Sequence, residues 1–131
     1  MSKVVVDTSV VSYLLKGHSL GLAYWNRYLA GNLLGISFMT VAELYRWPLE
    51  RTWSDRRLQA LIEHLRGYVV MPYDNAMSWE WAKLMSRKGR PISVADAWIA
   101  ATAIAHEASL VTHNAKHFSG IDGLEVLSIP G

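Results

Sequence analysis

The pattern of apolar and polar residues predicts a chain in which short buried strands alternate with helices. Strands are expected where short apolar runs lie between turn residues. These runs cover residues 4–6, 33–38, 68–71, 110–112 and 124–129. Because helical patterns separate the runs, we expect an α/β fold with a parallel sheet covered by helices on both faces.

The helices are expected where apolar residues recur at every third or fourth position. They cover residues 10–15, 20–29, 39–47, 75–85 and 94–105, with a further helix that begins near residue 53 and ends before Gly67. Ser19, Thr40 and Ser93 stand where they could cap three of these helices. Pro48 either interrupts the third helix or begins a new turn.

The first strand, residues 4–6, consists of three valines and leads directly into Asp7. Such a strand is expected to be buried on both faces, as inside a parallel sheet. Ligands bind at the carboxyl ends of the strands in open α/β sheets, so Asp7 is a candidate binding residue. The alternative is that Asp7 only caps the helix that follows, a role that Thr8 or Ser9 could also fill.

Composition narrows the class of protein. A chain of 131 residues with 51% hydrophobic residues is expected to form one domain with a real core. No apolar run approaches the ~20 residues that a membrane span needs, and a charge at Asp7 interrupts any signal-peptide core. The absence of cysteine fits a cytoplasmic protein.

A net charge of +2 does not by itself predict nucleic-acid binding. The six tryptophans indicate a large-side-chain core or an aromatic interface.

Three acids stand at the ends of predicted elements: Asp7 after the first strand, Glu43 early in the helix after the second, and Asp96 in the first turn of the alanine-rich helix. Strand ends and the starts of the following helices lie on one edge of a parallel sheet, so these carboxylates are expected to converge. A divalent cation would remove their mutual repulsion, and oxygen ligands favour Mg²⁺ or Mn²⁺ over zinc. The alternative is that Glu43 and Asp96 only complement helix dipoles.

Four sequence blocks resemble the PIN-domain family in content and order. They are VVVDTS at 4–9, TVAEL at 40–44, SVADAWIAATA at 93–103 and LVTHNAKHF at 110–118. The chain is most similar to the small VapC-type toxins of VapBC toxin–antitoxin operons, which are Mg²⁺-dependent ribonucleases. The resemblance implies a single PIN domain over residues 1–131, folded as a three-layer α/β/α sandwich around a mostly parallel sheet of four to five strands. It also implies a cytoplasmic endoribonuclease toxin that takes Mg²⁺, with Mn²⁺ as a substitute. Its implied partners are RNA, a cognate antitoxin and a second copy of the chain, with no membrane.

Under this resemblance Asp7, Glu43 and Asp96 match the family's catalytic metal-binding acids. Family members commonly carry a fourth acid where this chain has His117, so we expect one firmly bound cation. Asn114 could donate an oxygen or hold a water, and His117 could contact phosphate. Ser9 and Thr112 are candidates for orienting the carboxylates, with helix capping and strand-end hydrogen bonding as their alternatives.

Two further groups could contact a partner. Lys83, Arg87, Lys88 and Arg90 form a basic stretch that could bind RNA, or else a solvated surface loop. Tyr45, Trp47 and Trp53 could stack on bases or form a groove for an antitoxin helix, although core packing is the ordinary role of such residues. The alternative function is a degenerate PIN domain that binds RNA without cleaving it.

Overall fold

Strand β1, Lys3–Val6, lies at the centre of the fold. The computed structural model describes residues 1–130. Val4 and Val6 belong to one buried cluster and Val5 belongs to the other. Because side chains alternate along a strand, those of β1 pack into two separate cores, one on each face of the sheet. This is expected for a strand buried on both faces.

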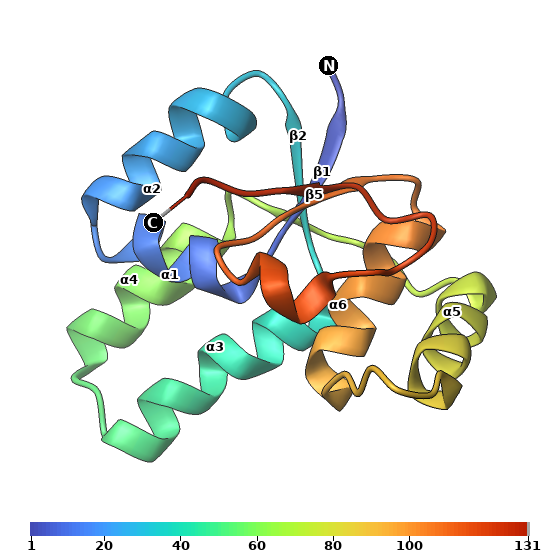
Figure 1. Ribbon diagram of the computed structural model, residues 1–131. Coiled ribbons are helices and arrows are strands. Elements are labelled where there is room, and N and C mark those ends of the chain that lie inside the picture. The colour runs from blue at the N-terminus through green and yellow to red at the C-terminus, as the bar shows by residue number, and fades with distance from the viewer. Residues whose placement is uncertain (131) are drawn as a thin grey trace.

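Four further strands complete the sheet, and every pairing is parallel. They are β2 (Leu33–Ile36), β3 (Val69–Val70), β4 (Ser109–Val111) and β5 (Val126–Leu127). The strand order is β3-β2-β1-β4-β5, so the chain builds outward on one side of β1 and then crosses to its other side. The predicted α/β fold with a parallel sheet is confirmed (Figure 1).

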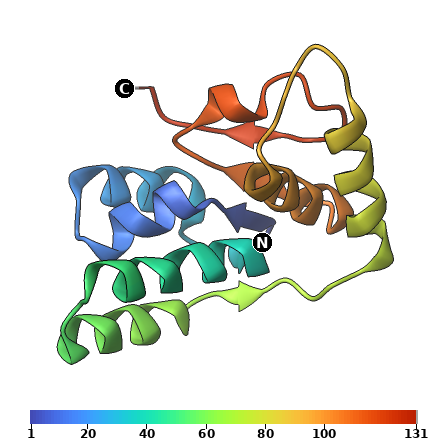
Figure 2. The same ribbon diagram turned by 90° about the horizontal axis from the view of Figure 1, so that it is seen from below.

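Helices cover both faces of this sheet (Figure 2). Helices α1 (Thr8–Leu15), α2 (Ser19–Tyr24), α3 (Phe38–Arg51) and α4 (Asp55–Leu65) contribute side chains to the core that contains Val4 and Val6. Helices α5 (Asn75–Ser86) and α6 (Val94–Ala105) contribute to the core that contains Val5. The result is the three-layer α/β/α arrangement that the family resemblance implies.

Three predicted boundaries are wrong because of local hydrogen bonds. The second strand ends at Ile36 rather than at residue 38, since Ser37 accepts a bond from the Met39 amide and begins α3. Helix α3 is therefore capped by Ser37 and not opened by Thr40. Helix α2 is capped by His18, whose Nδ1 accepts from the Leu20 amide, rather than by Ser19.

Other differences concern the length of elements. The predicted helix 20–29 changes after Tyr24 into a π-helical turn, η1 (Trp25–Leu29). Pro48 does not interrupt α3, which continues to Arg51 and ends at Thr52 with a left-handed φ of 51°. Proline removes one backbone hydrogen bond, and the other bonds of this 14-residue helix suffice to continue it. Strands β3 and β5 are two residues each, shorter than the predicted runs.

A short 3₁₀ helix, η2 (Ala115–Phe118), follows β4. It carries His117 and Lys116 toward the edge of the sheet where β1 and β4 end. Within residues 1–130, no helix combines the length and the apolar character that a membrane span requires.

Candidate active site

The candidate site lies where β1 and β4 end side by side. β2 and β4 pair with opposite sides of β1. The direction in which successive strands are added to the sheet therefore changes between β1 and β4. The Asp7 amide donates to the Val111 carbonyl at 2.9 Å, which keeps the two strand ends together. A crevice at such a reversal, outside the carboxyl ends of parallel strands, is the usual binding position in open α/β sheets.

Asp7 is almost completely buried, with 4% of its surface exposed. It occupies the N-cap position of α1, but its carboxylate makes no capping hydrogen bond. Its Oδ2 instead accepts from the Thr112 hydroxyl at 2.6 Å and from the Ser9 hydroxyl at 3.0 Å. The helix-capping interpretation is therefore wrong for this side chain, which two hydroxyl donors hold in place.

Both hydroxyls also accept hydrogen bonds from the loop after β4. The Asn114 amide donates to Thr112 Oγ1 at 3.0 Å, and the His113 amide donates to Ser9 Oγ at 3.1 Å. Each hydroxyl thus links a backbone N–H to the same carboxylate oxygen of Asp7. This chain of bonds fixes both the Asp7 rotamer and the path of the loop.

Glu43 lies in the second turn of α3 and is half-buried. The Thr8 hydroxyl donates to its Oε1 at 2.8 Å and also lies 3.0 Å from the Thr40 hydroxyl. Thr8 is the first residue of α1, directly after Asp7. The turn between β1 and α1 therefore serves two of the three acids. Asp7 is one of them, and its neighbour Thr8 holds the second, Glu43.

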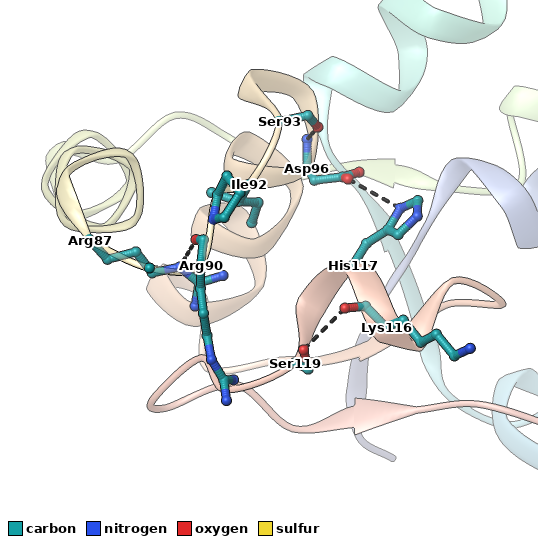
Figure 3. A pocket seen from close by; sticks show the side chains of 10 residues that line it. Arg87, Arg90, Ile92, Ser93, Asp96, Lys116, His117 and Ser119 are labelled. Atoms are coloured by element: carbon teal, nitrogen blue, oxygen red, sulfur yellow. Dashed lines mark hydrogen bonds and ion pairs between the residues drawn. The ribbon is translucent and has the colours of Figure 1, made fainter.

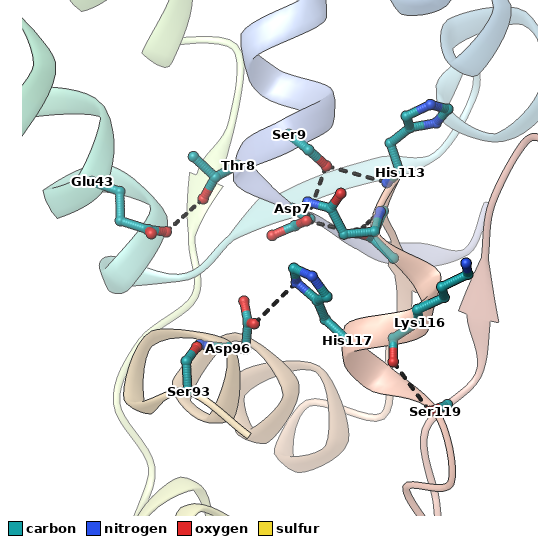
Figure 4. A network of polar contacts seen from close by, with 12 residues as sticks. Asp7, Thr8, Ser9, Glu43, Ser93, Asp96, His113, Lys116, His117 and Ser119 are labelled. Atoms are coloured by element: carbon teal, nitrogen blue, oxygen red, sulfur yellow. Dashed lines mark hydrogen bonds and ion pairs between the residues drawn. The ribbon is translucent and has the colours of Figure 1, made fainter. Parts of the chain in front are cut away.

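Asp96 lies in the first turn of α6, which Ser93 caps by accepting from the Asp96 amide at 3.1 Å. Its Oδ2 is 3.4 Å from Nδ1 of His117 on η2. The imidazole at the position where the family resemblance implies a fourth acid therefore faces a carboxylate of the site (Figure 4).

One cavity of about 540 Å³, which we name the acid cavity, brings these groups together. Asp7, Glu43 and Asp96 all line it, although they come from three separate elements. The other predicted site residues that line it are Ser9, Asn114 and His117; Thr112 is fully buried behind Asp7. Tyr13, Lys16 and Trp47 complete the wall on the side of α1 and α3.

The electrostatics of the acid cavity disfavour three free negative charges. Burial is the main cause that raises the pKa of Asp7, and the negative charge of Asp96 adds to it, while the Thr112 and Ser9 hydrogen bonds oppose it. Burial also raises the pKa of Glu43, against the Thr8 hydrogen bond and with added repulsion from Asp7 and Asp96. A bound cation would relieve this repulsion.

The donor set fits a hard divalent ion, but the side chains are not arranged as a finished site. Three carboxylates and the Asn114 amide offer the oxygen ligands that Mg²⁺ or Mn²⁺ prefer. Among residues 1–130, no group of three or more His, Cys, Asp or Glu side chains is placed so that it could hold a metal ion. Glu43 is engaged by Thr8 and Asp96 by His117, so a shared ion requires side-chain rearrangement.

The predicted basic stretch divides into two parts. Arg87 and Arg90 line a second cavity, also about 540 Å³, together with Lys116 and His117. We name this the basic cavity (Figure 3). Lys83 instead pairs with Glu80 at 3.0 Å on α5 and lines a different cavity, and Lys88 is exposed on the loop.

The predicted aromatic group is also divided. Tyr45 and Trp53 line an apolar groove of about 620 Å³ between α3 and α4, with Pro48, Leu49, Thr52, Leu58 and Ile62. Trp47 lines the acid cavity and, with Lys16 and Trp53, a neighbouring one. The cavities therefore adjoin one another through shared residues.

Sequence reasoning missed Thr8, Lys16 and Lys116 as residues around the site. A signal for Lys16 was present, because Ser9, Ser12 and Lys16 recur at helical spacing along an otherwise apolar helix. All three line the acid cavity. Thr8 stands next to Asp7 at a strand end, but nothing local indicates that its hydroxyl reaches Glu43.

Comparisons with known proteins show the family to which this chain belongs. The PIN domain family model matches residues 4–124. Ribonuclease VapC1 of Haemophilus influenzae strain R2866 is 32% identical over 126 residues, covering 92% of this chain and 93% of that protein. Among solved structures, VapBC-1 from nontypeable Haemophilus influenzae superposes with a TM-score of 0.81 at 26% identity, covering 96% of this chain and 97% of that chain. VapBC2 from Rickettsia felis, bound to a DNA fragment from its promoter, gives 0.85 at 23% identity and covers 98% and 99%. The chain therefore belongs to the PIN-domain family and, within it, to the VapC proteins.

Proposed function

We propose that the protein is a metal-dependent endoribonuclease that acts as the toxin of a type II toxin–antitoxin pair. One observation carries the proposal: Asp7, Glu43 and Asp96, far apart in sequence, line a single cavity at the carboxyl edge of the sheet. The name of the relative that is 32% identical, Ribonuclease VapC1, supports the same activity. Such a toxin would act in the cytoplasm, where its RNA substrate is found.

Asp7, Asp96 and Glu43 are the residues that would hold Mg²⁺, with Mn²⁺ as a substitute. When bound, the cation would polarise the scissile phosphate and lower the pKa of an attacking water. Burial raises the pKa of Asp7 and of Glu43, so it disfavours their charged forms. A cation bound in this cavity would stabilise those charged forms, which supports a metal site here. We expect one firmly bound ion, because His117 supplies an imidazole where a fourth carboxylate would otherwise stand.

The surrounding residues hold these acids in position. Ser9 and Thr112 fix the Asp7 carboxylate, so that it needs little reorganisation when a ligand arrives. We assign to Glu43, which is less buried than Asp7, the role of orienting a water or accepting its proton. Asn114 and His117 are exposed at the mouth of the cavity and available to contact a substrate phosphate.

We also propose an antitoxin helix as the occupant of the apolar groove between α3 and α4. Leu49 in this groove is 82% exposed, and such apolar surface is expected to be covered by a partner. Trp53 also lines the cavity that adjoins the acid cavity, so a bound segment could continue toward the acids. A homodimer is expected from the family, and light scattering after gel filtration would establish its mass.

RNA cleavage with and without Mg²⁺ tests the proposed function. Wild-type protein should cut RNA with Mg²⁺ and lose the activity in EDTA, while Asp7→Asn and Asp96→Asn should remain folded and inactive. A matched control is Asp122→Asn, an exposed acid outside the acid cavity, which should cut like wild type. Full activity in either site variant would overturn the assignment. RNA binding without cleavage under all conditions would support the degenerate, RNA-binding alternative, which the Asp96–His117 contact favours.

A further inference from the structure

We propose that Tyr24 is a positioning residue that orients Asp7 from outside the acid cavity. It acts through two intermediates, the peptide bond between Thr112 and His113 and the hydroxyl of Ser9. The inference rests on the proposed function, because it makes a metal-binding acid depend on a side chain that touches neither metal nor RNA. Tyr24 is the last residue of α2 and is fully buried, so it acts only through its neighbours in the protein.

The hydroxyl of Tyr24 joins α2 to the loop after β4 and to the segment after β5. It lies 3.2 Å from the Thr112 carbonyl and 2.6 Å from Nδ1 of His113. The Ile129 amide donates to it at 3.0 Å, and the Ser128 hydroxyl lies 3.4 Å away. These partners stand 88 to 105 positions from Tyr24 in the sequence, so one buried hydroxyl connects three distant parts of the chain.

The hydrogen-bonding capacity of the phenol decides which group donates to which. A tyrosine hydroxyl has a single proton to donate, and its oxygen can accept. The buried Thr112 carbonyl has no other hydrogen-bond donor within residues 1–130, and buried carbonyls are rarely left unpaired. The Tyr24 proton therefore belongs on this carbonyl. The phenol oxygen then accepts from the Ile129 amide and from Nδ1–H of His113, which makes neutral His113 the Nδ1-protonated tautomer.

The peptide bond between Thr112 and His113 is consequently held at both ends. Its carbonyl accepts from Tyr24, and its N–H donates to Ser9 Oγ at 3.1 Å. Because the peptide is planar and trans, these two groups point in opposite directions and turn together. A rotation that freed the carbonyl from Tyr24 would also turn the N–H away from Ser9.

Ser9 transmits this orientation to Asp7. Its hydroxyl accepts from the His113 amide and donates to Asp7 Oδ2 at 3.0 Å (Figure 4). Linked hydrogen bonds of this kind strengthen one another, so loss of the first weakens the last. Figure 4 also shows the His113 ring directed away from Asp7, Asp96 and His117. His113 therefore serves the site through its backbone and not as a metal ligand.

Tyr28 offers a matched control, because its hydroxyl contacts the same segment after β5. It donates to the Ser128 carbonyl at 3.3 Å. Within residues 1–130, the Tyr28 hydroxyl makes no hydrogen bond to the loop after β4. Tyr24→Phe and Tyr28→Phe thus remove the same atom and each loosen the segment after β5, but only the first removes support from the peptide that leads to Asp7.

The tautomer of His113 tests the network in the wild-type protein, without any substitution. In ¹⁵N NMR spectra at pH 8, above the ordinary pKa of histidine, His113 should carry its proton on Nδ1. A proton on Nε2 would mean that Tyr24 donates to His113 and not to the Thr112 carbonyl, which would overturn the proposal. Amide exchange at His113 should become about tenfold faster in Tyr24→Phe and stay unchanged in Tyr28→Phe.

Cleavage of fluorescein-labelled, mixed-sequence single-stranded RNA with Mg²⁺ tests the consequence for the site. Tyr24→Phe should lower kcat by roughly three- to tenfold with KM unchanged, because Tyr24 contacts no substrate. Its affinity for Mn²⁺, measured by calorimetry, should fall by a similar factor. Tyr28→Phe should match wild type in both. Combined with Ser9→Ala, Tyr24→Phe should cause little further loss, because both act on Asp7 through the same hydrogen bond.

Wild-type kcat and Mn²⁺ affinity in Tyr24→Phe, or equal losses in Tyr28→Phe, would overturn the positioning role. Losses that multiply when Tyr24→Phe and Ser9→Ala are combined would overturn the route through Ser9. If the wild-type protein cuts no RNA, the proposed function fails, and amide exchange at His113 and Mn²⁺ affinity still decide whether Tyr24 orients Asp7. Thermal unfolding of each variant establishes that it is folded at the assay temperature.

Discussion

The Thr112 hydroxyl donates a 2.6 Å hydrogen bond to Asp7 across 105 positions of the sequence. Both residues are buried, and they stand at the ends of the neighbouring parallel strands β4 and β1. The same hydroxyl accepts from the Asn114 amide, so a single side chain connects the loop to the most buried acid. The position of Asp7 in the candidate site depends on this contact.

Thr112→Val should damage both stability and activity. The change keeps the shape of the side chain but removes one of the two hydroxyl donors to Asp7 and leaves the Asn114 amide without its acceptor. We expect a loss of about 1–3 kcal/mol in the free energy of unfolding, and about 10–100-fold in Mg²⁺-dependent cleavage. Urea unfolding and a cleavage assay would measure these losses. Thr112→Ser, which retains the hydroxyl, should recover most of both, and wild-type behaviour of the valine variant would refute the positioning role.

Asp7→Asn should stabilise the metal-free protein near pH 7 while abolishing cleavage. Burial raises the pKa of Asp7, so its contribution to stability is full below the ordinary pKa of 3.8 and is lost as pH rises through the raised value. Asparagine does not titrate and can still accept from Ser9 and Thr112. Urea unfolding in EDTA should therefore show a gain at pH 7 that shrinks toward pH 3. A variant less stable than wild type at pH 7 would contradict the account.

His117→Asp should strengthen divalent-ion binding. It removes the imidazole that faces Asp96 at 3.4 Å and supplies a carboxylate at the position where the family resemblance implies a fourth acid. Titration calorimetry with Mn²⁺ should find one site in wild type, and either a second site or about tenfold tighter binding in the variant. Two tight sites in the wild-type protein would disprove the expectation of a single firmly bound cation.

Gly21→Ala should destabilise the fold. A Cβ on Gly21 would lie 2.9 Å from backbone atoms of Tyr13 and Leu14, so α2 and the end of α1 would have to separate. Overpacking of this kind costs about 1–3 kcal/mol, measurable by urea unfolding. Gly67→Ala is the matched control, since its Cβ would meet only the His64 carbonyl at 3.4 Å. Equal stability of the two variants would show that helix packing does not depend on Gly21.

The sheet and the convergence of the acids were both predictable from the sequence. The sheet follows from the pattern of apolar residues, and the convergence follows from the positions of the acids along the predicted elements. Val4 to Val6 identify a doubly buried strand, and Asp7, Glu43 and Asp96 occupy element ends that a parallel sheet brings to one edge. These predictions need only local patterns and the handedness of parallel connections.

The remaining features depend on contacts that no local pattern encodes. The partner of Asp7 is a threonine 105 residues away, and the cap of α3 is Ser37 because its hydroxyl reaches the Met39 amide. The π-helical turn Trp25–Leu29 keeps the apolar spacing of an ordinary helix, so periodicity could not reveal it. The pairing of Asp96 with His117 likewise joins two sequence blocks that are predicted separately.

The most direct test of the account is the anomalous scattering of Mn²⁺ in a crystal of the protein. The account predicts one strong peak in the acid cavity, at bonding distance from carboxylate oxygens of Asp7 and Asp96, with Glu43 near enough to bind directly or through a water. A Mn²⁺ peak elsewhere, or none in this cavity at millimolar Mn²⁺, would contradict the claim that these acids form a metal site.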